Sequence, residues 1–261
     1  MEENRFIPGR NDRIKLIAHR GFTPMAPQNS LPAFLEAGRR GFWGIETDVR
    51  RTADGHLVCV HDATVDSLYL GSGAVAEMTL AELRQLVRKE TSKEYPEQYI
   101  GGGVHRWNSE DLRVPMYSQY LQICRACGAV PFVELKTDDV VQVMEETVHY
   151  FHEGEVVMSS SVLSHLEKVR TLTNKTFVHH IFSNEDCSKT LAQWGRAGHA
   201  YNYPDLDEVP EGLIERDHEL GVCVCLRAGD TRENVCRMVE MGLDYVPTNL
   251  MEPSVYRKFA K

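Results

Sequence analysis

The sequence predicts an α/β fold consisting of one (β/α)8 barrel, and three observations lead to this prediction. The chain has 261 residues, and barrels of this kind commonly take about 250. Eight candidate parallel strands alternate with candidate helices along it. The competing fold, a doubly wound open sheet, typically has a glycine-rich nucleotide-binding loop after its first strand, and the chain has none there.

The candidate strands are apolar segments bounded by polar residues or turn signals. The eight parallel candidates are residues 14–18, 43–50, 130–135, 156–160, 177–182, 199–203, 222–226 and 245–248. A further strand, residues 57–61, follows the hairpin signal Asp54-Gly55, so it is expected to run antiparallel to the second barrel strand. We expect a register in which the numbers of two paired residues add up to an odd number. His61 would then lie on the same face of the hairpin as Glu46 and Asp48.

Three helices have recognisable ends. The first is expected to begin after the N-cap Ser30, with Pro32 in its first turn, and to end at Gly41. Thr79 and Glu82 have capping-box spacing, which predicts a helix over residues 79–89. The helix before the last strand is expected to begin at Asp230 and to end at Gly242.

The regular alternation is interrupted once, between the second and third barrel strands. Residues 62–115 are polar toward their end and include Gly101-Gly102-Gly103. We interpret residues 1–261 as a single barrel domain, with about residues 62–115 forming a small subdomain inserted after the second strand hairpin.

The charge balance excludes some kinds of partner. Twenty-nine Lys and Arg against 38 Asp and Glu give a net charge of −9. This argues against binding to nucleic acid or an anionic membrane, which needs basic patches. It permits a small anionic substrate if the site supplies its own cations. The oligomeric state is left open.

Cysteine usage and hydropathy suggest a cytoplasmic protein without stable membrane association. Seven cysteines, an odd number, argue against a disulfide framework. Cys124 and Cys127 fall on a candidate helix and have no second pair to complete a zinc site, so we interpret them as core residues. No apolar run approaches the roughly 20 residues of a membrane span, and the start of the chain is polar.

Polar side chains gather at the carboxyl ends of the candidate strands, where barrel active sites lie. They are His19, Arg20, Glu46, Asp48, His61, Glu134 and Lys136. Three carboxylates suit a hard cation such as Mg²⁺ or Ca²⁺. An arginine and a lysine suit a phosphate, and two histidines suit proton transfer near neutral pH. Together they indicate metal-assisted cleavage of a phosphodiester.

Each of these residues alone has an ordinary structural interpretation. An isolated Glu-x-Asp is usually a surface pair, and most of the eleven histidines are expected to be packed or exposed without a role. His179 and His180 are adjacent in a strand, so one of them faces the interior, where we expect core packing. The functional interpretation rests on the joint placement of complementary groups at strand ends.

The ordered motifs resemble the glycerophosphodiester phosphodiesterase family. The matching segments are His19-Arg20-Gly21, the run from Pro27 to Phe34, Glu46-Thr47-Asp48-Val49, the run from Thr52 to Asp62, and Glu134-Leu135-Lys136. The resemblance implies a TIM barrel with an inserted subdomain, a Ca²⁺ or Mg²⁺ site, and hydrolysis of glycerophosphodiesters to glycerol 3-phosphate and an alcohol. By motif, Glu46, Asp48 and Glu134 resemble metal ligands, His19 and His61 the acid/base pair, and Arg20 and Lys136 phosphate contacts.

The chain departs from the family pattern at several positions. Gln28 and Ser30 stand where Glu and Thr are usual, Leu226-Arg227-Ala228-Gly229 replaces Trp-Thr-Val-Asn, and Asn249 replaces Asp. We expect catalysis to survive these changes and Arg227 to add positive charge to the substrate pocket. The inserted segment is either a lid, with Gly101–Gly103 as a hinge and Trp107, His105 or Tyr69 as contacts to the alcohol, or a solvated loop with one aromatic side chain docked on the body of the protein.

Three alternatives remain open at this point. A phospholipase D-like or lyase activity on lysophospholipid-type diesters would use the same histidines and metal. A metal-dependent barrel isomerase or aldolase is a second alternative, although Arg20 and the paired histidines suit phosphate better. A non-catalytic phosphodiester-binding relative is the third, suggested by Gln28 and Arg227.

Overall fold

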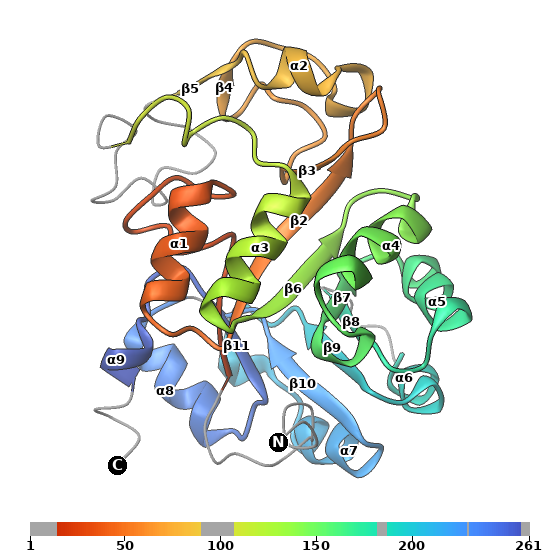
Figure 1. Ribbon diagram of the computed structural model, residues 1–261. Coiled ribbons are helices and arrows are strands. Elements are labelled where there is room, and N and C mark those ends of the chain that lie inside the picture. The colour runs from red at the N-terminus through yellow and green to blue at the C-terminus, as the bar shows by residue number, and fades with distance from the viewer. Residues whose placement is uncertain (1–14, 90–106, 182–186, 229, 257–261) are drawn as a thin grey trace.

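The computed structural model describes residues 15–89, 107–181, 187–228 and 230–256, and these form a barrel of parallel strands surrounded by helices (Figure 1). The barrel strands are β1 (Lys15–Ala18), β2 (Gly44–Arg51), β6 (Val130–Leu135), β7 (Val157–Ser160), β8 (Phe177–Ile181), β9 (Ala197–Tyr201), β10 (Val222–Leu226) and β11 (Tyr245–Thr248). Their order is β1-β11-β10-β9-β8-β7-β6-β2, and β1 also pairs with β2. The sheet is therefore closed, and the predicted (β/α)8 barrel is confirmed.

Helices lie on the outside of the barrel and follow the strands in sequence (Figure 1). They are α1 (Leu31–Arg39), α3 (Tyr117–Cys127), α4 (Val140–Tyr150), α5 (Leu163–Leu172), α6 (Ser188–Trp194), α7 (Leu213–Glu219), α8 (Arg232–Glu240) and α9 (Pro253–Tyr256). Within the described ranges, no helix is long and apolar enough to cross a membrane.

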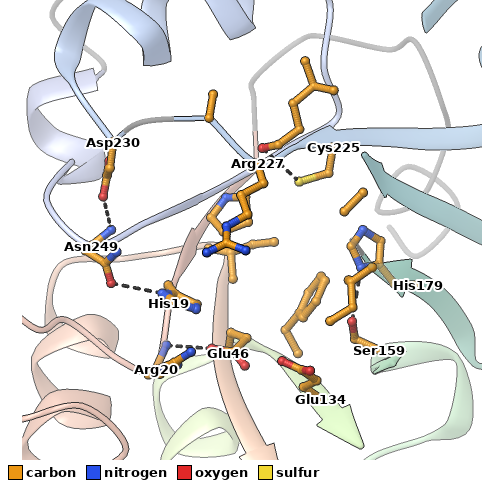
Figure 2. A pocket seen from close by; sticks show the side chains of 17 residues that line it. His19, Arg20, Glu46, Glu134, Ser159, His179, Cys225, Arg227, Asp230 and Asn249 are labelled. Carbon is orange, nitrogen blue, oxygen red and sulfur yellow. Dashed lines mark hydrogen bonds between the residues drawn. The ribbon is translucent and has the colours of Figure 1, made fainter. Parts of the chain in front are cut away.

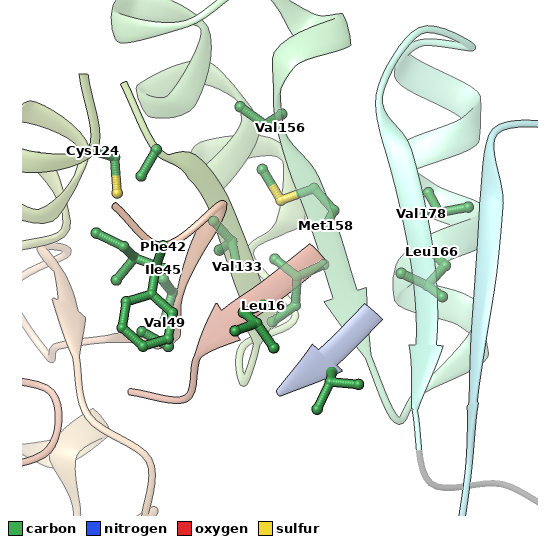
Figure 3. Packing of buried hydrophobic residues seen from close by; sticks show 14 of the residues in the cluster. Leu16, Phe42, Ile45, Val49, Cys124, Val133, Val156, Met158, Leu166 and Val178 are labelled. Carbon is green, nitrogen blue, oxygen red and sulfur yellow. The ribbon is translucent and has the colours of Figure 1, made fainter. Parts of the chain in front are cut away.

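Alternation along β2 separates the core from the site. Ile45 and Val49 point outward and pack in the apolar layer between strands and helices (Figure 3). Because successive strand side chains face opposite sides, Glu46 and Asp48 point into the barrel. There the apolar cluster that includes Phe132 fills the lower interior. The barrel thus presents buried carboxylates above a packed apolar floor.

One tyrosine ties the two strands that carry the carboxylates. The Tyr120 hydroxyl donates to the Ile45 carbonyl at 2.6 Å and accepts the Phe132 amide N–H at 3.0 Å. Ile45 lies in β2, Phe132 lies in β6, and Tyr120 is fully buried in α3. The hydroxyl therefore fixes α3 against the junction of these strands.

Tyr120→Phe is expected to lower the free energy of unfolding by about 1–3 kcal/mol. The substitution keeps the packed ring but leaves buried backbone groups without their partner, and such groups cost about that much. Urea unfolding followed by circular dichroism measures the effect, and Tyr150→Phe on α4, with an exposed hydrogen bond to Gln122, is the control. Equal stabilities of the Tyr120 variant and the wild type would contradict this account.

The register of the hairpin after β2 differs from the prediction. The numbers of paired residues add up to an even number, so the predicted odd-sum pairing is wrong. Strand β3 (Leu57–Cys59) is antiparallel to β2, and Val49 pairs with Cys59. The turn causes this register: the Thr52 amide donates to the His56 carbonyl, which closes a loop around residues 53–55. His61 lies beyond the end of β3, and its side-chain direction is not set by the strand ladder.

The inserted segment has its own apolar cluster. Strands β4 (Tyr69–Leu70) and β5 (Val87–Arg88) pair antiparallel, and the short helix α2 (Leu80–Leu83) lies between them in sequence. Val58, Val60 and Val114 of the hairpin and its surroundings pack into the same cluster, which joins the insertion to the barrel.

The predicted helix over residues 79–89 is wrong in length. The Thr79–Glu82 capping box is present, but α2 ends at Leu83. Residues 87–88 are extended because the buried Arg88 guanidinium donates to the Tyr69 hydroxyl and to the Gln28 carbonyl. Those tertiary contacts outweigh the local helical preference.

Two other boundaries differ from prediction. Strand β9 begins at Ala197, earlier than expected, because Ala197 and Gly198 pair with Val178 and His179 on β8 and with Val222 and Cys223 on β10. Helix α8 begins after Thr231, whose hydroxyl accepts the Asn234 amide. Asp230 is instead bound to the loop after β11, where it accepts from Thr248 Oγ1 at 2.7 Å.

Candidate active site

Three carboxylates meet inside the barrel, where the middle of β2 lies beside the carboxyl end of β6. One oxygen of each of Glu46, Asp48 and Glu134 lies within 4.8 Å of the others, and all three residues are buried. Asp48 and Glu134 are register partners on the neighbouring strands, and Glu46 lies one alternation away on the same inward face. The strand period places these groups together, as the sequence predicts.

The electrostatics of this trio favour a bound cation. Burial and the charges of Asp48 and Glu134 raise the pKa of Glu46 well above its usual value. Burial and Asp48 raise the pKa of Glu134 to about 7, against the opposing effect of Lys136. Among the described residues, Glu46 Oε1 and Asp48 Oδ1 accept no hydrogen bond. Oxygen ligands with unused lone pairs and excess negative charge fit Mg²⁺ or Ca²⁺, so the residues suit a hard divalent cation.

Asp48 is more tightly held than its two neighbours. Burial alone would raise its pKa, but the charges of Arg20, His61 and Lys136 lower it below the usual value. Lys136 forms an ion pair with Glu134 and lies 3.8 Å from Asp48 Oδ1. Lys136 therefore joins the two strands at the site.

Arg20 contacts the trio through its backbone and its side chain. Its φ of 58° lies in the left-handed region, and its amide N–H donates to Glu46 Oε2 at 2.7 Å. The guanidinium lies 3.4 Å from Asp48 Oδ2 and donates to Gln28 Oε1 at 2.7 Å. At position 28 an amide oxygen therefore serves as the acceptor for the arginine.

Asn29 is a site residue whose contact the sequence did not reveal. Its amide donates to Asp48 Oδ2 at 2.9 Å, and its carbonyl oxygen accepts from Thr47 Oγ1 at 2.8 Å. Its φ of 46° turns the loop before α1 toward the carboxylates, and Asn tolerates this conformation better than most residues. In the sequence, the only indication of this role was the position of Asn29 directly before Ser30, the N-cap of α1.

His19 lies at the end of β1 and lines the central pocket. Its Nδ1 is 3.1 Å from Asn249 Oδ1, and Asp230 in turn accepts from the Asn249 backbone N–H. Burial, followed by the charge of Arg20, lowers the pKa of His19 to about 3. The imidazole is therefore neutral, and with Nδ1 bonded to the amide oxygen, Nε2 is the nitrogen left for chemistry.

His61 reaches the site from beyond β3. Arg50 donates to its carbonyl from Nε at 3.0 Å and from a terminal nitrogen at 2.7 Å, while Asp62 Oδ1 lies 2.7 Å from its Nδ1. Its charge acts on the pKa values of both Asp48 and His19. Arg50 was not predicted as a site residue. It lies two residues after Asp48 on β2, so strand alternation already put it on the same face as the carboxylates.

The central pocket has a volume of about 360 Å³ and opens at the carboxyl end of the barrel (Figure 2). His19, Arg20, Glu46 and Glu134 line it together with Arg227. The rest of the wall is largely apolar and includes Ile17, Phe132, Ile181, Ala200, Leu226 and Pro247. Two arginine side chains and an apolar recess thus lie in one cavity.

The structure does not bring the expected insertion contacts to this pocket. Trp107 donates its indole N–H to the Met25 carbonyl at 3.3 Å and is not a lining residue. Tyr69 is buried against Arg88. His105 and residues 101–103 lie outside the described residues.

At the end of a (β/α)8 barrel, these groups define a hydrolase that acts on phosphate esters. Residues 19–252 match the family model described as the glycerophosphoryl diester phosphodiesterase family. The chain belongs to this family and is an enzyme.

Relatives extend the match over the chain. A glycerophosphodiester phosphodiesterase of Caldanaerobacter subterraneus is 26% identical over 243 residues, which cover 90% of this chain and 93% of the relative. A probable glycerophosphodiester phosphodiesterase 1 of Mycobacterium tuberculosis is 49% identical over 71 residues, covering 27% of this chain and 26% of that protein.

Solved structures share the fold. A putative glycerophosphoryl diester phosphodiesterase from Silicibacter pomeroyi superposes with a TM-score of 0.82 at 21% identity, covering 98% of this chain and 96% of the other. An Oleispira antarctica phosphodiesterase in complex with the product sn-glycerol-3-phosphate has a TM-score of 0.78 at 19% identity and covers 98% of both chains.

Proposed function

We propose that the enzyme hydrolyses glycerophosphodiesters to glycerol 3-phosphate and an alcohol, in a reaction that depends on a divalent cation. The buried trio of Glu46, Asp48 and Glu134 carries the proposal, because its carboxylates lie together next to Arg20, and Glu46 and Glu134 line the same pocket as that arginine. The family match supports the substrate class, and so does the product complex of the Oleispira relative.

In the proposed mechanism the trio holds Mg²⁺ or Ca²⁺, which supplies Lewis-acid stabilisation of a phosphate oxygen. Arg20 and Lys136 neutralise charge on the other phosphoryl oxygens. Arg227, directly after β10, adds a further cation at the pocket wall.

His19 and His61 are proposed as the acid/base pair. One removes a proton from water or from a neighbouring substrate hydroxyl, and the other protonates the departing alcohol oxygen. Attack by the hydroxyl gives a cyclic phosphate, which water must open in a second step to give glycerol 3-phosphate. The neutral ring of His19 can accept a proton at Nε2, and Asp62 orients the ring of His61. His19 directly follows β1 and His61 lies beyond the end of β3, so the two groups come from different segments of the chain.

Chelation is expected to abolish release of glycerol 3-phosphate from glycerophosphocholine. Protein treated with EDTA and dialysed would be assayed for this product after adding back Mg²⁺, Ca²⁺ or Mn²⁺, and at least one ion is expected to restore turnover. A cyclic phosphate product would favour the lyase alternative. Binding of the diester without turnover under any ion would favour a non-catalytic relative.

The proposal also includes a cytoplasmic location and a single domain with its insertion at about residues 62–115. All seven cysteines have free thiols, which suits a reducing compartment. The insertion shares its apolar cluster with the hairpin that leads to His61, so its packing supports the site from outside the barrel.

A further inference from the structure

A polar pair inside the barrel lies beyond the groups used in this mechanism. Glu134, Ser159 and His179 are successive register partners on β6, β7 and β8, so they form a row around the inner wall. Ser159 Oγ lies 3.3 Å from His179 Nδ1, and the two residues are only 1% and 2% exposed. Both line the central pocket, on the side opposite His19 (Figure 2).

The other ring nitrogen of this histidine lacks a partner. Among the described residues, His179 Nε2 makes no hydrogen bond although it is buried. The Phe132 ring meets the imidazole edge-on at 5.0 Å between centroids, the Tyr245 ring lies 6.0 Å away, and the apolar Ile181 and Ala200 line the same pocket. A buried polar atom costs free energy when it is unpaired, so its presence on a pocket wall indicates a partner brought by the ligand.

The charge of the pair limits what that partner is. Burial, followed by the nearby His199 and His180, lowers the pKa of His179 to about 3. The imidazole and the Ser159 hydroxyl are therefore neutral, and they offer neither a cation for a phosphate nor an anion for a quaternary ammonium group. A neutral hydroxyl, which both donates and accepts, matches either tautomer of the ring.

We propose that Ser159 and His179 form an inner subsite that binds a hydroxyl group of the substrate. Ser159 orients the ring, and His179 Nε2 makes the contact with the substrate. The inference rests on the proposed function, since the diester phosphate must sit at the carboxylates for one of its arms to enter the recess. The hydroxyl comes from the glycerol arm or from the alcohol arm, and substrates distinguish these two sources.

The test compares diesters that differ by one hydroxyl. Glycerophosphocholine and its analogue lacking the glycerol 2-hydroxyl probe the glycerol arm, while the glycerophosphodiesters of ethylene glycol and of ethanol probe the alcohol arm. His179→Leu is expected to raise KM about tenfold for the hydroxyl-bearing member of one pair. The other member is expected to change less than about twofold, with kcat nearly constant.

Further variants separate contact from packing. His179→Gln restores a polar group near the position of Nε2 and is expected to recover most of the lost affinity. Ser159→Ala removes less volume and is expected to raise KM for the same substrate. Val178→Ala on the same strand faces the outer apolar layer (Figure 3), so it controls for lost stability and is expected to leave the KM ratio within each pair unchanged.

If His179→Leu raised KM equally for all four diesters, or left KM unchanged for all of them, the proposed subsite would be overturned. If the wild type hydrolyses none of them, the proposed function fails, and calorimetric Kd values for the same diesters then replace KM. A Kd ratio that His179→Leu changes within one pair still supports the subsite. Equal Kd changes within both pairs, or the absence of any binding, reject it.

Discussion

Glu46→Gln is expected to lower kcat/KM by about 10²- to 10⁴-fold and to remove the thermal stabilisation that Mg²⁺ or Ca²⁺ gives to the wild type. A bound cation supplies several kcal/mol of transition-state stabilisation, and each 1.36 kcal/mol is about a factor of ten in rate. The amide has the shape of the carboxyl group and can still accept from the Arg20 N–H, so the metal-free variant is expected to fold and melt as the wild type does. Activity assays and melting curves with and without EDTA measure both effects.

The control is a carboxylate of similar burial outside the site. Glu36 in α1 is 7% exposed and pairs with Arg39 and Arg40. Glu36→Gln is expected to lower stability slightly, to leave kcat/KM unchanged, and to keep the response to the cation. The metal-site assignment fails if Glu46→Gln retains both normal turnover and the stabilisation by the ion.

His19→Ala and His61→Ala are each expected to reduce kcat by about 10²- to 10⁴-fold, the usual cost of losing a general acid or base. Both side chains lie at the pocket end of the barrel rather than in the packed core, so the variants are expected to fold. Stopped assays of glycerol 3-phosphate release measure the loss. Because the two groups act in one step, the double variant is expected to lose less than the product of the single effects.

A 4-nitrophenyl phosphodiester assigns the two roles. Its leaving group departs without a proton, so the variant lacking the general acid is expected to recover rate on this substrate, while the variant lacking the base is not. His56→Ala, exposed in the turn between β2 and β3, is the control and should retain full activity. Near-wild-type turnover of glycerophosphocholine by both alanine variants would exclude the acid/base pair.

The barrel and most of the candidate site were predictable because they depend on patterns between residues that are close in sequence, such as the alternation of side chains along a strand. Strand alternation alone puts Glu46 and Asp48 on one face, and the parallel neighbour brings Glu134 to the same rim. The Thr79–Glu82 capping box is equally local, since its hydrogen bonds join residues three apart. Such features need no knowledge of distant segments.

Only the tertiary structure decided the remaining contacts. The turn register and Arg50, not strand alternation, place His61, and Asp230 leaves its expected helix cap to bind the loop that carries Asn249. His179 lines a pocket, and its ring fits there because Gly198 on the neighbouring strand has no side chain: a β-carbon at Gly198 would come within 2.9 Å of His179 Cδ2. By itself the sequence determined the fold, the carboxylate face and the kinds of groups at the strand ends, since these follow from short repeats. The partners of those groups come from segments far apart in the chain, so these contacts exist only once the closed barrel brings the segments together.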